Sequence, residues 1–137
     1  MLTEKDYCDY ETCVALKKLG YKDKTLAYYT SEGIFYWRRA YIYDVAIPDL
    51  AKSSNKERYK HVLDAVNLWD AQKWLREEKN IIVEVFVDDD SDTPITYNIY
   101  KDGECVCHHH GKYWSVKEWS EALLEGIKEA VKILKEK

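Results

Sequence analysis

The stretch that most constrains the fold runs from Asn67 to Val87, where a helical pattern changes directly into a strand pattern. Asn67 is a good helix N-cap because its side-chain oxygen can accept a hydrogen bond from a first-turn amide. Asn80 tolerates the left-handed conformation that ends many helices. The apolar spacing then changes from about 3.6 to about 2 residues, which predicts a strand over 81–87. A helix that leads so abruptly into an apolar strand must share its core.

A β-hairpin is predicted after this strand. Residues 95–100 form its first strand, and Asp102-Gly103 is a strong signal for a two-residue turn. In a regular ladder the turn pairs Lys101 with Glu104 and places Val106 on the core side. The other face of the second strand then carries three side chains that can bind metal: Cys105, Cys107 and His109.

The last predicted helix begins with a capping box of Ser115 and Glu118 and continues as one apolar stripe to near the C-terminus. Gly126 lies within it and indicates close packing there. Residues 67–137 therefore have the order α-β-β-β-α, a three-stranded antiparallel meander with helices able to cover its apolar face. We predict an α+β fold.

Residues 1–66 are predicted to hold a helix, an aromatic β-hairpin and a loop that pack on the rest, so that the chain forms one compact domain. The helix runs from Tyr10 to about residue 19 with Asp9 as its cap, although Thr3 offers an earlier cap. The strands span 26–29 and 34–43. Residues 59–66 fit a short strand or a helical turn, and periodicity does not decide between them.

The charge distribution argues against nucleic acid as a partner of the C-terminal part. The chain has 21 basic and 25 acidic residues, and residues 67–137 hold 10 of the basic and 15 of the acidic ones. The α-β-β-β-α order is also that of a double-stranded-RNA-binding domain, but the turn that opens the last helix has no basic cluster. Double-stranded nucleic acid is therefore an unfavourable ligand.

The chain has the features of a cytoplasmic protein. Its N-terminus shows no apolar signal segment, and no apolar run approaches the ~20 residues of a membrane-spanning helix. The four cysteines are interpreted as reduced thiols. We expect a cytoplasmic location and no membrane partner.

An aromatic and basic cluster is the first candidate binding site. It contains Trp37, Arg38, Arg39 and Tyr41, with Arg58 further along the chain. Aromatic rings beside guanidinium groups suit a protein interface, or stacking on a base together with phosphate binding. The alternative is an aromatic strand whose arginines extend to solvent.

The run from Cys105 to His110 is the second candidate. Thiolate and imidazole are ligands that zinc prefers, so Cys105, Cys107 and His109 could hold Zn²⁺ with a fourth ligand from elsewhere. The alternative is a half-exposed strand with incidental thiols. This alternative is favoured because the chain offers no second paired-ligand motif, so no cofactor is expected.

Asp88, Asp90 and Asp92 alternate as calcium ligands do in an EF-hand loop. The position that requires glycine is Thr93, however, and the twelfth position is Ile99. A solvated hairpin loop is therefore the favoured interpretation.

Three segments resemble a group of uncharacterised small proteins found in Bacteroidetes and their phages. They read DYETCVALKKLGY, AQKWLREEKNIIVEV and YWSVKEWSEALLEGIKEAVKIL. The resemblance covers about half of the chain and implies a phage or mobile-element accessory protein. It implies no catalytic residues.

No recognisable catalytic motif or glycine-rich phosphate loop is present. The expected function is therefore non-enzymatic binding, with a host factor, another protein, a nucleotide-like ligand or a second copy of the chain as partner. The alternative is a metal- or thiol-dependent enzyme that uses the Cys105–His110 run.

Overall fold

A computed structural model describes residues 2–23, 25–37, 63–108 and 111–136. The chain divides into two compact units. Unit 1 combines Met1–Cys8 with Asn67–Lys137, and unit 2 is Asp9–Val66. Each unit has its own small antiparallel sheet and is described by itself.

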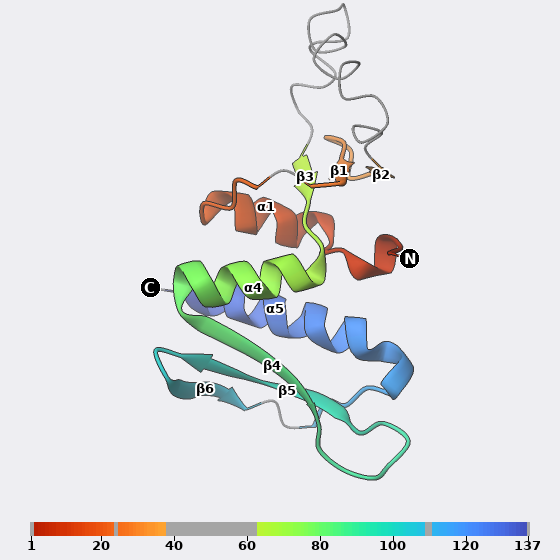
Figure 1. The fold of residues 1–137 in the computed structure, drawn as a ribbon, viewed down its shortest axis with the longest axis vertical. Coiled ribbons are helices and arrows are strands. Elements are labelled where there is room, and N and C mark those ends of the chain that lie inside the picture. Colours follow the sequence, from red (N-terminus) through yellow and green to blue (C-terminus); the bar gives the residue numbers. More distant parts are fainter. Residues whose placement is uncertain (1, 24, 38–62, 109–110, 137) are drawn as a thin grey trace, which may run out of the picture. The chain divides into compact units, whose positions relative to one another are not determined.

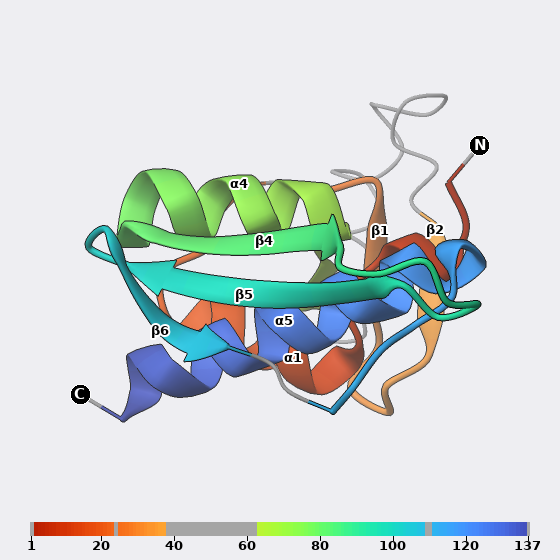
Figure 2. The same ribbon diagram turned by 90° about the horizontal axis from the view of Figure 1, so that it is seen from below.

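Unit 1 confirms the predicted α+β class and the α-β-β-β-α order. Its strands pair antiparallel in the order β4-β5-β6. Figures 1 and 2 show α4 and α5 on the same side of this sheet. The elements are η1 (Glu4–Asp6), α4 (Leu68–Lys79), β4 (Ile81–Val87), β5 (Ile95–Lys101), β6 (Glu104–His108), η2 (Val116–Glu118) and α5 (Trp119–Lys135).

The helix-to-strand junction forms as predicted. The Asp70 N–H donates to Asn67 Oδ1 at 2.7 Å, which satisfies one of the orphan amides of α4. Asn80 ends the helix in the left-handed region with φ of 52°. Its Nδ2 donates to Asp102 Oδ1 at 2.9 Å and so links this junction to the β5–β6 turn. Both local signals are confirmed.

The register of β6 follows the prediction only as far as Cys105. Lys101 pairs with Glu104 and Tyr100 with Cys105, and Asp102 and Gly103 have the positive φ angles, 52° and 86°, of the expected tight turn. The ladder then shifts, so that Cys107 lies opposite Ile99 and His108 opposite Asn98. The predicted pairing of Val106 with Ile99 is wrong, because Val106 is the extra residue of a β-bulge and is 46% exposed.

The sheet and α5 approach one another closely at Gly126, as its place in the helix predicted. A Cβ atom on Gly126 would clash with Val83 Cγ1 and lie 3.3 Å from Tyr97 Cγ. Only a hydrogen at this position lets α5 lie directly on β4 and β5. Around it the core is closed by buried apolar side chains, among them Ile81, Ile99, Leu123, Ile127 and Ala130.

Unit 2 contains α1 (Tyr10–Lys18) and a sheet of three short strands, β1 (Ala27–Tyr29), β2 (Phe35–Trp37) and β3 (Leu63–Ala65). The order is β2-β1-β3 and all pairs are antiparallel. Residues 63–65 are thus a strand and not a helical turn, the two alternatives that the sequence left open for this part of 59–66.

Asp9 caps α1, since the Thr12 N–H donates to Asp9 Oδ1 at 2.9 Å. The competing signal at Thr3 is also used, but it begins the separate turn η1. Gly20 follows α1 with φ of 113°, a conformation that favours glycine. Among the described residues no helix is long and apolar enough to cross a membrane.

Candidate functional site

The first candidate site is described only in part. Trp37 ends β2 and is 47% exposed, whereas Arg38, Arg39, Tyr41 and Arg58 lie outside the described residues. The adjacent Tyr36 is 45% exposed and Ile34 is 46% exposed. We call Ile34, Tyr36 and Trp37 the hairpin edge, because β2 is an outer strand of the sheet that the structure describes.

A series of ring contacts holds Trp37 in place. Edge-to-face pairs join Tyr10 of α1 to Tyr29 at 5.7 Å, Tyr29 to Phe35 at 5.5 Å, and Phe35 to Trp37 at 5.1 Å between centroids. Such pairs contribute about 0.5–1.5 kcal/mol each beyond their buried area. Trp37 is therefore a half-exposed ring supported by a series of aromatic contacts.

Tyr36 is supported from the other face of the sheet. It lies opposite Tyr28 in the ladder, and the two rings stack with centroids 5.7 Å apart and planes 23° apart. Neighbouring residues of a strand point to opposite faces. The hairpin edge thus presents one supported aromatic ring on each side of β2, a shape that suits a partner that contacts the strand from its edge.

The second candidate site is changed by the bulge. Cys105 lies opposite Tyr100 and Cys107 opposite Ile99, two consecutive residues of β5. Their side chains therefore point to opposite faces of the sheet, which corrects the expectation that both thiols share a face. His109 lies outside the described residues. Among the residues that are described, no three His, Cys, Asp or Glu side chains are grouped as metal ligands.

The two thiols have different surroundings. Cys105 is exposed, and its thiol donates a weak hydrogen bond to the carbonyl of Cys107 at 3.7 Å. Cys107 is half-buried on the face toward α5. Burial raises the pKa of Cys107, and the negative charge of nearby Glu129 raises it further. The fraction of Cys107 present as the nucleophilic thiolate near neutral pH is therefore reduced.

This difference predicts an order of alkylation. Iodoacetamide is expected to modify Cys105 faster than Cys107 in the folded protein. The ratio of the two alkylation rates is expected to fall as the pH rises toward the raised pKa of Cys107, because the thiolate is the reactive form. Peptide mass spectrometry of timed samples measures both rates. Cys8 and Cys13 are buried and serve as slow internal controls. Equal rates at Cys105 and Cys107 near neutral pH contradict the opposite placement.

A polar row that the sequence did not indicate crosses the sheet on the face opposite the helices. It consists of Glu84, Asn98, Tyr100 and His108. Asn98 Nδ2 and the Tyr100 hydroxyl each donate to Glu84 Oε1 at 3.4 Å, and His108 Nδ1 lies 2.7 Å from Asn98 Oδ1. Asn98 is 8% exposed. Its buried amide is therefore satisfied on both sides.

The row determines the tautomer of His108. Asn98 directs its amide nitrogen toward Glu84 and its oxygen, which can only accept hydrogen bonds, toward His108. The Nδ1 of His108 must then carry a proton. The arrangement could be recognised only once the bulge had placed His108 opposite Asn98.

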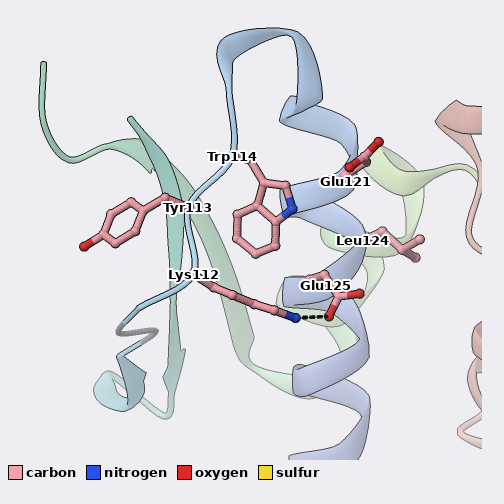
Figure 3. Close-up of a pocket in the computed structure, with 6 residues that line it drawn as sticks. All are labelled: Lys112, Tyr113, Trp114, Glu121, Leu124 and Glu125. Atoms are coloured by element: carbon pink, nitrogen blue, oxygen red, sulfur yellow. Dashed lines mark ion pairs between the residues drawn. The ribbon is translucent and has the colours of Figure 1, made fainter. Parts of the chain in front are cut away.

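A surface hollow of about 300 Å³ lies between residues 112–114 and α5. Figure 3 shows Lys112 and Trp114 pointing toward the helix and Tyr113 pointing away from it. Lys112 Nζ lies 3.9 Å from Glu125 Oε2 across the hollow. The hollow is completed by Glu121 and Leu124. The positive charge of Lys112 in this hollow is thus already balanced by Glu125 of the same chain.

No protein-family model, no curated protein and no solved structure matches the chain.

Proposed function

We propose that this chain is a non-enzymatic binding protein that contacts another protein through the hairpin edge. The observation that carries the proposal is the pair of exposed, supported rings of Tyr36 and Trp37. Aromatic side chains dominate protein interfaces because they bury a large area and lose little rotamer freedom. Rings that neighbouring side chains already hold in place lose even less rotamer freedom when they bind, which favours binding.

The described part of the hairpin favours a protein over a nucleotide. From residue 25 to 37 the only charged residue is Glu32, so the edge itself offers apolar area and no cation for phosphate. Arg38 and Arg39 follow directly in the sequence, and arginine is a residue type that is enriched in protein interfaces. A nucleotide-like ligand that uses these arginines is the second option, and self-association is a third.

The setting of the proposed role is the cytoplasm. All four cysteines are free thiols, which suits a reducing compartment. The resemblance to small phage-related proteins supports an accessory role directed at a host factor. The rival function, a metal- or thiol-dependent enzyme, has less support because the thiol of Cys105 bonds to the Cys107 carbonyl rather than to an activating base.

The test replaces the two rings together. The double variant Tyr36→Ala/Trp37→Ala is expected to weaken partner binding by at least about 30-fold, since loss of even one hot-spot aromatic side chain costs about 2 kcal/mol or more. The matched control is Trp69→Ala, which removes a ring of similar exposure, 43%, from α4 of unit 1. Wild-type protein, the control and the double variant are each immobilised and exposed to an extract of the source cell. A protein that binds the first two but not the double variant is purified, and its affinity for all three is measured by calorimetry.

Each alternative gives a different result. Equal capture by all three proteins contradicts the proposal. Nucleotide binding that survives in Tyr36→Ala/Trp37→Ala and is lost in Arg38→Ala/Arg39→Ala identifies the second option instead. Concentration-dependent mass in sedimentation, abolished by the double variant, identifies a second copy of the chain as the partner.

A further inference from the structure

The outer edge of β4 in unit 1 has main-chain groups that face away from the sheet. β4 is an outer strand in the described order β4-β5-β6. At its two ends the Asp102 N–H donates to the Asn80 carbonyl at 3.1 Å and the Asp88 N–H donates to the Pro94 carbonyl at 2.8 Å. Even-numbered residues of β4 therefore bond to β5, and the N–H and C=O groups of odd-numbered residues point outward.

One outward group of this edge, the carbonyl of Val83, is bonded to the chain itself. Gln72 of α4 donates from Nε2 to the outward carbonyl of Val83 at 2.7 Å. This bond confirms the outward direction of the odd-numbered groups independently. It also blocks the edge at Val83, which is one way in which proteins protect outer strands from unwanted pairing.

The part of the edge at Val85 and Val87 is open with respect to the described chain. No hydrogen bond joins the outward groups of Val85 and Val87 to any other part of the chain that the structure describes. Val87 is 63% exposed, and Val85 and Phe86 are half-buried. An apolar outer strand with unpaired main-chain groups is a template for an additional strand.

The residues that follow the open edge are acidic. Asp88, Asp89, Asp90 and Asp92 are all exposed in the loop that leaves β4. Hydrogen bonds from Ser91 lower the pKa of Asp89, so this carboxylate is charged at neutral pH. An incoming strand with basic side chains would meet favourable charge there. A second copy of this chain would bring the same acidic loop and a net charge of −4.

We propose that Val85–Val87 accepts an extended, basic segment of another protein as a fourth strand of the β4-β5-β6 sheet. The main chain of the segment bonds to the outward groups of Val85 and Val87, and its basic side chains lie against the aspartates of the loop. This surface belongs to unit 1 and is independent of the hairpin edge, so its test stands apart from that of the proposed function.

The test uses a short synthetic peptide of alternating Val and Lys residues as the probe, with an alternating Val and Glu peptide for comparison. The Val–Lys peptide is expected to bind the full chain and to slow amide hydrogen exchange at Val85 and Val87, while the Val–Glu peptide does neither. Val87→Pro removes an outward N–H without removing a β4–β5 bond, and is expected to weaken binding by about tenfold. Val87→Ala keeps the N–H and is the matched control.

A second variant keeps the test decisive if the proline disturbs the strand. Asp89→Asn/Asp90→Asn/Asp92→Asn changes only exposed loop residues and is expected to weaken binding at low salt and to remove most of its salt dependence. The proposal is overturned if both peptides bind alike, if exchange slows at β6 instead of β4, or if Val85 and Val87 become protected with rising protein concentration and no peptide.

Discussion

Gly126→Ala is expected to lower the free energy of unfolding of unit 1 by about 1–2 kcal/mol, as overpacking of a core commonly does. Alanine is the better helix former by about 1 kcal/mol, so helix propensity alone predicts the opposite sign. The structure decides the sign because the added Cβ would clash with Val83 Cγ1. Val83 is buried and β-branched, so its side chain has few other rotamers.

A double-mutant cycle separates the clash from other effects. Val83→Ala removes Cγ1 and leaves space that the new Cβ can fill, so Gly126→Ala is expected to be neutral or stabilising in that background. Urea-induced unfolding is monitored by the hydrogen-exchange protection of the β5 amides, so that the measurement reports on unit 1 alone. Additive effects of the two changes, or a more stable Gly126→Ala single variant, contradict the close approach of α5 to β4.

Ile99→Ala is expected to cost about 2–5 kcal/mol, whereas Val106→Ala changes stability by less than about 0.5 kcal/mol. Ile99 is fully buried between the sheet and the helices, and its removal leaves a cavity. Val106 is the bulged residue of β6 and is 46% exposed. A regular ladder would instead place Val106 opposite Ile99 in the core, where its truncation would also be costly.

The same urea experiment compares the two variants. Ile82→Ala is the control for loss of an isoleucine from an exposed strand position, since Ile82 lies on β4 and is 40% exposed. A large loss of stability in Val106→Ala would contradict the bulge and restore the regular register. It would also return Cys105 and Cys107 to one face of the sheet.

The features that sequence predicted well depend on neighbouring residues. The Asn67 cap, the left-handed Asn80 and the Asp102-Gly103 turn each follow from the backbone preferences of one or two residues. The capping box at Ser115 is also present, although it opens a 3-10 turn before α5 begins. Strand β4 has the expected bounds because its alternation is strong. These are short-range effects, so one sequence suffices to recognise them.

The candidate sites depended on information that the sequence does not carry. A period-2 pattern assumes an unbroken ladder, and Val106 breaks it without any glycine or proline to signal the bulge. One extra residue exchanged the faces of Cys107 and His108. It also brought His108 to Asn98, whose bond at 2.7 Å completes the polar row. For Trp37 the sequence predicted an aromatic strand, but the supporting rings of Tyr10, Tyr29 and Phe35 came from the fold.

The helix-to-strand stretch from Asn67 to Val87 shows where the division lies. Sequence alone determined that it forms α4 and then β4, because caps and periodicity act within a few residues. Only the tertiary structure decided that β4 is an outer strand of the described sheet, that Gln72 bonds to its outward Val83 carbonyl, and that no described residue bonds to the outward groups of Val85 and Val87. Those outcomes depend on which strands pair and on which side chains reach across, and these are contacts between residues distant in the chain.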